Sequence, residues 1–479
     1  MKIDSFADET EQRLEQLFSG QSDYRSRRLT IGGTACRLIY MDTLVDSSLV
    51  QQFVLTPLLD RPSEPVRDVV TVLDYAETES LEEAAKAIVE GYTVLLRDGD
   101  RSLYLLGTQL KKERALTIPF NERVIRGSNE AFNENLDTTV NLMRNLINTP
   151  EFIVREYTIG RRSQTRVVLM YVKTIADETM AEELGKRIGG IDIDYLESPG
   201  FVDELIRERK FSLFPQTLVT ERPDRARAYA MEGKFVVAAD GSPDMVVLPV
   251  SFWSFFQSPE DYQVSWFVGT VFRLLRIACL FLTIGLPALY VSVSSFNPQL
   301  LPINFVNTLQ SSLKYVAFPP FLEALSMMLL LEVLREATIR LANPVGQTIG
   351  VVGGIVIGTV VVQSNLVSNT MVIIAALTGL ASFILPSYEM SSAIRLLSYP
   401  ALFLSALFGL LGLVVFFMML CIHLCRLETM GVPYFKPPFT LDETKDTLFR
   451  APVWSMAKRT EATAPNNRTR LRDPRGWKR

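Results

Sequence analysis

At 479 residues the chain is too long for one ordinary domain, and its composition divides into a charged first half and an apolar second half. The formal net charge is -4, and no basic stretch interleaved with aromatic residues precedes the apolar half, so nothing indicates a nucleic-acid partner. The N-terminus lacks a charged segment followed by an apolar one. We therefore expect no signal peptide, and the first 250 residues should remain on the side of synthesis.

The residue types that carry most enzyme chemistry are sparse. Four cysteines at positions 36, 279, 421 and 425 are scattered, which fits a reducing compartment and gives no disulfide framework. His423, the single histidine, lies between Cys421 and Cys425, but at i+2 on a helix it points away from both thiols. The chain also lacks Walker-type, dinucleotide GxGxxG, HExxH and GxSxG motifs. We predict no enzyme, no cofactor and no metal site.

The first part of the chain predicts an α/β fold after a polar N-terminal tail at 1–30, which should be a loose segment or a helix. Ser80 and Glu83 have capping-box spacing at the start of a helix. Asp98-Gly99 is a hairpin turn. The predicted elements are a strand at 36–41, a helix at 47–59, a strand at 66–73, a helix from Ser80 to Gly91, and hairpin strands at 92–97 and 102–106.

The same pattern recurs later in the chain. Residues 90–99 align with 232–241, and residues 40–46 align with 171–177, at offsets of 142 and 131. Similar offsets predict one duplicated unit, although helix-Gly-strand and Asp-Gly turns are common enough to arise independently. The resulting organisation is a first α/β subdomain at 31–118, a linker at 119–150 with a helix at 136–147, and a second α/β subdomain at 151–250.

Residues 251–430 predict an α-helical polytopic membrane domain. Charge-free runs at 277–296, 341–388 and 396–425 meet the requirement of about 20 apolar residues per span, and 341–388 holds two spans with a break near 363–365. The aromatic groups 252–256 and Trp266-Phe267 are placed where a membrane interface would lie. Arg273 and Arg276 then mark the cytoplasmic mouth of the first span, and a basic cytoplasmic tail follows at 431–479.

Glycines in the longest apolar run recur every four residues. Glycine costs roughly 1 kcal/mol relative to alanine inside a helix. Four at this spacing therefore indicate a groove for close helix packing, in the pore region of a membrane assembly, rather than a lone anchor. The candidate packing residues are Gly346, Gln347, Gly350, Gly353, Gly354 and Gly358.

A charged segment at 318–340 precedes the glycine run. Several charges together cannot face lipid, so they should meet each other, another subunit, the interface or water. Five apolar candidates cannot all span the membrane if both ends are cytoplasmic, so this segment is the one that should re-enter or lie at the interface. Its candidate ions are Glu323, Glu332, Arg335, Glu336 and Arg340.

Several motifs resemble the A-subunit family of GerA-type bacterial spore germinant receptors over nearly the whole chain beyond residue 30. The linker motif contributes the candidate residues Arg126, Gly127, Glu130 and Phe132, with Ser128-Asn129 where that family usually has Gly-Pro. The other matching segments are 148–150, 214–217, 221–224, 240–243, 317–323, 334–337, 344–347 and 350–354.

This resemblance implies a spore inner-membrane protein that acts with a transporter-like B subunit and a lipoprotein C subunit to sense nutrients. It implies a ring-forming homo-oligomer that conducts ions or signals in a ligand-gated complex. Two alternatives remain. One is an accessory paralogue that enlarges ion release without sensing nutrients, and the other is a secondary transporter, which the lack of an inverted repeat disfavours.

Overall fold

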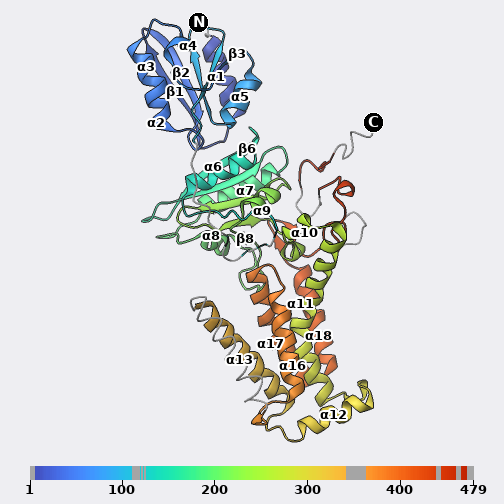
Figure 1. The fold of residues 1–479 in the computed structure, drawn as a ribbon. Coiled ribbons are helices and arrows are strands. Elements are labelled where there is room, and N and C mark those ends of the chain that lie inside the picture. The colour runs from blue at the N-terminus through green and yellow to red at the C-terminus, as the bar shows by residue number, and fades with distance from the viewer. Residues whose placement is uncertain are drawn as a thin grey trace. The chain divides into compact units, whose positions relative to one another are not determined.

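The computed structural model describes residues 6–110, 119, 122, 124, 126–340, 363–437, 444–459 and 465–471 (Figure 1). These divide into two compact units. The α/β unit holds the described parts of 1–210, 217–250 and 457–479, and the helical unit holds those of 211–216 and 251–456. The fold class is therefore an α/β part with two similar subdomains followed by a helical part, as the sequence predicts.

The first subdomain is an antiparallel sheet with helices on both faces (Figure 1). Its strand order is β1-β2-β4-β5-β3. Side chains alternate between two cores: Ile39 and Met41 pack with α1 and α5, whereas Cys36 and Leu38 pack with η1, α3 and α4. The elements are α1 (Phe6–Leu17), β1 (Tyr24–Ile31), β2 (Thr34–Met41), α2 (Ser47–Leu49), the π-helix η1 (Val50–Leu55), α3 (Thr56–Asp60), α4 (Val66–Val69), β3 (Tyr75–Thr78), α5 (Leu81–Val89), β4 (Tyr92–Arg97) and β5 (Leu103–Gly107).

Two features of this subdomain differ from the sequence interpretation. Residues 66–73 were expected to form a strand but contain the short helix α4, because Val66, Val69 and Val70 are buried at helical spacing after Pro65. The subdomain also begins before residue 31. Helix α1 buries Leu14 in the core and β1 is the edge strand of the sheet, so the predicted tail at 1–30 contains folded structure.

The second subdomain repeats this connectivity. Its strand order, β6-β7-β9-β10-β8, corresponds strand for strand to that of the first sheet, which confirms the predicted duplication. Gly91 and Gly233 precede equivalent strands at φ +86° and +90°, a conformation that favours glycine. The elements are α6 (Leu136–Leu146), β6 (Phe152–Ile159), β7 (Thr165–Val172), α7 (Glu178–Gly189), α8 (Pro199–Ile206), β8 (Leu218–Thr220), α9 (Pro223–Ala230), β9 (Phe235–Ala239) and β10 (Met245–Leu248).

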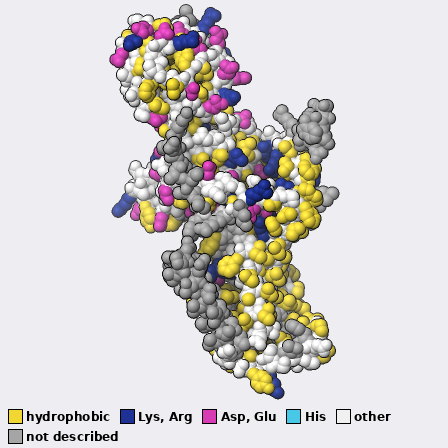
Figure 2. Space-filling model, viewed as in Figure 1, with side chains coloured by type: hydrophobic (Ala, Val, Ile, Leu, Met, Phe, Trp, Pro, Cys, Tyr) yellow, Lys and Arg dark blue, Asp and Glu magenta, His cyan; other side chains and the backbone are white. Residues whose placement is uncertain are grey.

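Among its described residues, the helical unit contains two helices long and apolar enough to cross a membrane, α11 (Trp266–Ser295) and α17 (Tyr388–Phe408). Two shorter apolar helices, α16 (Asn369–Phe383) and α18 (Leu410–Cys425), pack with them. Hydrophobic side chains cover much of the visible outer surface of these helices (Figure 2). The remaining elements are the 3-10 helices η2 (Phe252–Phe256), η3 (Pro298–Leu300) and η5 (Val453–Ser455), the helices α10 (Glu260–Gln263), α12 (Ile303–Leu313) and α13 (Pro320–Arg340), and the strands β11 (Glu428–Thr429) and β12 (Val432–Pro433).

The structure of this unit bears on three features of the sequence interpretation. The run 396–425 is not one helix, because Gly409 at φ +62° ends α17 and starts α18. The aromatic group 252–256 forms η2 and is buried, with Phe252 against Tyr434 and Phe435, so it does not lie on a membrane-facing surface. The glycine run, including Gly346, Gln347, Gly350, Gly353, Gly354 and Gly358, lies outside the described residues.

Candidate functional site

The linker motif is held by a buried arginine of the second subdomain. Arg222, fully buried, donates to the carbonyl oxygens of Ser128 at 2.8 Å and Glu122 at 3.2 Å, and to Asp224 at 2.7 Å. The backbone N–H of Phe132 donates to the carbonyl oxygen of Glu221 at 2.9 Å. Two segments that the sequence singled out separately, 126–132 and 221–224, therefore meet.

Within that motif the candidate residues are placed differently. Phe132 is buried, Glu130 is half-buried, and Arg126 and Gly127 are exposed. Gly127 has φ +137°, in the region that favours glycine. The C-terminal end of the motif is thus packed against the second subdomain, while its N-terminal end is exposed to solvent.

The carboxyl group of Asp244 lies close to Glu221 and Glu122 of this region. Burial raises the pKa of Asp244, and the nearby carboxylates of Glu221 and Glu122 raise it further. The ionised form of Asp244 is therefore disfavoured in the folded protein.

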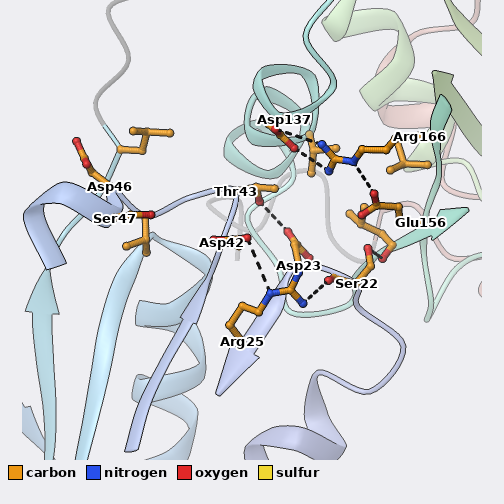
Figure 3. A pocket seen from close by; sticks show the side chains of 15 residues that line it. Ser22, Asp23, Arg25, Asp42, Thr43, Asp46, Ser47, Asp137, Glu156 and Arg166 are labelled. Atoms are coloured by element: carbon orange, nitrogen blue, oxygen red, sulfur yellow. Dashed lines mark hydrogen bonds and ion pairs between the residues drawn. The ribbon is translucent and has the colours of Figure 1, made fainter. Parts of the chain in front are cut away.

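A cleft of about 660 Å³ lies between the two subdomains (Figure 3). Its lining includes Asp42 and Arg25 from the first subdomain, and Asp137, Glu156 and Arg166 from the other side. Arg166 donates to Asp137 at 2.9 Å and to Glu156 at 2.5 Å, and these hydrogen bonds raise its pKa. The volume suits a small polar molecule.

A buried ion pair joins the two subdomains beside this cleft, and Asp23, one of its members, also lines the cleft. The Arg144 side chain is 0% exposed and that of Asp23 is 7% exposed. Arg144 donates to the two carboxylate oxygens of Asp23 at 2.7 and 2.5 Å and to Gln21 at 3.1 Å. Thr43 also donates to Asp23, at 2.7 Å. Helix α6, which carries Arg144, therefore fixes the second subdomain to the first.

In the helical unit, Glu323 joins three helices. Its fully buried carboxylate accepts hydrogen bonds from Tyr290 of α11 at 3.3 Å and from the Ser368 hydroxyl at 2.8 Å. Ser368 in turn caps α16 by accepting from the N–H of Met371. The other oxygen, Oε1, has no hydrogen-bond partner among the described residues. Glu323 therefore links α13, α11 and the start of α16.

The ions further along α13 meet a residue that the sequence interpretation missed. Glu332 lies 3.3 Å from Arg335 and 3.3 Å from Arg395 of α17. Arg335 also donates to Ser382 at 2.6 Å. A cavity of about 30 Å³ between these groups can hold a water molecule. Glu336 is exposed, and the side chain of Arg340 lies outside the described residues.

A second buried ion cluster surrounds the start of α11. Arg273 and Arg276 were interpreted as flanking charges, but both are buried. Arg276 binds Asp261 at 2.8 Å, and Arg273 binds Asp446 at 3.2 Å. Because these carboxylates neutralise the two arginines, α11 can begin at Trp266, about three helical turns before the predicted span at 277. His423, near the end of α18, lies 3.1 Å from the Ser212 hydroxyl.

Some of the missed residues carry a signal in the sequence. Leu136, Val140, Met143 and Arg144 recur at helical spacing, so Arg144 falls on the buried face of α6. A buried arginine on an apolar face requires a partner. The identity of that partner, Asp23, could not be read from the spacing because the two residues are 121 positions apart.

Comparison with known proteins gives a consistent family. Residues 12–462 match the family described as Bacillus/Clostridium GerA spore germination protein. "Spore germination protein A1" of Bacillus subtilis (strain 168) is 34% identical, over 92% of each chain. "Spore germination protein GerQA" of Bacillus cereus is 35% identical, over 94% of this chain and 91% of that protein. "Uncharacterized membrane protein YfkQ" of Bacillus subtilis (strain 168) is also 35% identical, over 94% of this chain and 89% of the relative.

A solved structure is also similar, the N-terminal domain of the A subunit of the Bacillus megaterium spore germinant receptor GerK3. It covers 50% of this chain and 94% of its own, with 23% identity and a TM-score of 0.38.

Proposed function

Because the chain belongs to the GerA family of spore germination proteins, we propose that it is the membrane subunit of a nutrient receptor that triggers spore germination. It would form the ring-like part of a ligand-gated complex that conducts ions or passes on the signal. The observation that carries this proposal is the match to germination proteins over about nine-tenths of both chains.

The polar groups inside the helical unit support a role beyond anchoring. An anchor needs only apolar residues, whereas charged groups among apolar helices are costly and usually serve function. Glu323, Glu332, Arg335 and Arg395 all lie on helices of this unit, and each has a polar partner on another helix or turn. Hydrogen bonds and ion pairs between helices can exchange partners when the helices move, as a gated assembly would require.

The placement of the C-terminal segment supports the proposed topology. Residues 457–459 and 465–471 pack in the same compact unit as the N-terminal subdomains. If this unit lies on one face of the membrane, the N-terminal subdomains and the C-terminal segment share that face, and the number of crossings between them would be even. We place that face in the cytoplasm and the protein in the spore inner membrane, because the C-terminal segment is basic.

The complex would contain a transporter-like B subunit, a lipoprotein C subunit and further copies of this chain. The glycine run would supply the contact between protomers or between neighbouring helices, since close backbone approach drives helix association in lipid. An accessory role that enlarges ion release is the second candidate, because the uncharacterised membrane protein YfkQ is as similar to this chain as the named germination proteins are. A secondary transporter is the third.

The test is ion release and complex formation in spores that carry Gly354→Leu or Val356→Leu. The leucine at 354 would separate helices along the predicted packing stripe, whereas the change at 356 lies off that stripe. We expect Gly354→Leu to disrupt assembly or to leave ion release uncontrolled, and Val356→Leu to be tolerated. Normal assembly and normal release with Gly354→Leu would contradict the proposed role of the glycine run.

A further inference from the structure

The described residues after the helical unit, 457–459 and 465–471, pair with each other as the two sides of a loop. The Arg459 N–H donates to the carbonyl oxygen of Arg468 at 2.8 Å, and the Arg470 N–H donates to that of Ala457 at 2.8 Å. The Arg459 guanidinium donates to the carbonyl oxygens of Asn467 and Thr469 at 2.9 and 2.7 Å. Arg459 thus holds the two described sides of the loop together through hydrogen bonds to carbonyl oxygens of residues 467–469.

This loop is docked on the second α/β subdomain. The Asn466 N–H donates to the carbonyl oxygen of Ile175 at 2.8 Å, and the Asn466 side chain donates to that of Ala176 at 2.9 Å. Arg459 Nε donates to the carbonyl oxygen of Met231 at 2.8 Å. Arg470 lies 3.7 Å from Glu232. Four contacts from three residues therefore hold the loop on two turns of the subdomain.

In the first subdomain, the equivalent turn and glycine contact residues that come soon after β5. There the Leu110 N–H donates to the carbonyl oxygen of Leu44 at 2.8 Å, and the side chain of Gln109 lies 3.2 Å from the point where Gly91 would carry a Cβ. Residues 109 and 110 directly follow the hairpin of β4 and β5. The first subdomain thus completes its own edge with the next residues of the chain.

In the second subdomain the equivalent groups meet the C-terminal loop instead. Leu44 aligns with Ile175, and Gly91 aligns with Gly233. The Ile175 carbonyl accepts from Asn466 at the same 2.8 Å, and Pro465 lies 3.2 Å from the Cβ position of Gly233. Pro465-Asn466 therefore takes the place that Gln109-Leu110 takes in the first copy.

We propose that residues 457–459 and 465–471 form a strap that completes the second subdomain and ties it to the chain that leaves α18. The duplicated fold needs an extended segment at this edge to satisfy a turn carbonyl and to cover a glycine. After β10 the chain continues to η2, so the C-terminal segment supplies what the neighbouring residues do not. Any displacement of the second subdomain is then passed to the chain after α18 through the strap as well as through the connection to α11.

Hydrogen–deuterium exchange of the full-length protein tests the strap with three variants. Arg459→Ala removes three hydrogen bonds, each contributing a factor of roughly 2 to 12. We therefore expect at least about tenfold faster exchange of the peptide that covers 465–471. Asn466→Pro removes the N–H that binds Ile175 and should have the same effect. Lys458→Ala removes an exposed charge next to Arg459 and should leave the exchange unchanged.

The peptide that ends at Leu110 is the internal reference, because it makes the equivalent contact in the first subdomain. It should keep its protection in every variant, which shows that the protein remains folded. Exchange of 465–471 in the unmodified protein at the rate of an unstructured peptide would overturn the proposal. So would equal protection in the Arg459→Ala and Lys458→Ala proteins. Neither result depends on the role in germination.

Discussion

Replacing Arg144 with methionine tests how the two subdomains are held together. Methionine keeps much of the apolar stem of the side chain but removes every donor to Asp23, Gln21 and the carbonyl oxygen of Phe152. Asp23 then remains 7% exposed with the Thr43 hydroxyl as its side-chain donor. The variant leaves a nearly uncompensated buried carboxylate.

Removing one partner of a buried ion pair costs about 3–5 kcal/mol, whereas replacing both partners with neutral groups is often close to neutral. Domains have a free energy of unfolding of about 5–15 kcal/mol, so the single change consumes a large fraction of it. With denaturant slopes of about 1–3 kcal/mol per molar urea, the midpoint should fall by at least about 1 M. The double variant Asp23→Leu, Arg144→Met should recover most of that loss.

The buried thiol of Cys36 in β2 gives a local readout in the full-length protein. Burial raises the pKa of this thiol and keeps it from reagents, so alkylation of the Cys36 peptide follows opening of the first subdomain. Arg25→Met is the matched control, since Arg25 pairs with Asp42 at 3.9 Å with both side chains about half exposed, and such pairs contribute about 0–1 kcal/mol. Equal midpoints for Arg144→Met and Arg25→Met, or strictly additive effects in the double variant, would refute the reasoning.

Three further outcomes are expected. Glu323→Gln keeps an oxygen that can accept from Ser368 and should preserve the amount of protein in the membrane, whereas Glu323→Leu should lower it, as measured by immunoblot; equal amounts would contradict the role of the carboxylate as a helix tie. Asp244 has a pKa raised by burial, so its contribution to stability is full below the unfolded pKa and is lost as the pH rises through the folded one; Asp244→Asn should raise Tm at pH 8 more than at pH 4, and the reverse order would contradict this. Reporter tags fused to the two ends of the chain should both be cytoplasmic, and tags on opposite faces would exclude an even number of crossings.

The local pattern was sufficient for several elements of the α/β unit. The Ser80 cap of α5, the turn at Gly99 and the repeated order of strands all depend on short-range chemistry, and the structure contains them. Helix α4 was missed because three valines within five residues fit both a strand and a helix, and only burial on one helical face separates the two. The break at Gly409 was missed because glycine is also common inside membrane helices.

The partners of the buried ions could not be predicted from the sequence, for a different reason. Arg395 lies 63 residues from Glu332, and Asp446 lies 173 residues from Arg273, so no periodicity connects them. The sequence predicted a basic tail at 431–479 and indicated no contact between that tail and the α/β subdomains. The structure shows its described residues docked through backbone carbonyl oxygens, which leave no mark in the sequence.

We propose above that this chain is a receptor subunit. The most direct measurement compares ion release in response to a panel of single nutrients from spores with and without the gene for this chain. A receptor subunit predicts that release is lost for particular nutrients and unchanged for the others, and that the intact gene restores it. Equal release for every nutrient, or a uniform slowing for all of them as an accessory paralogue would give, contradicts the claim.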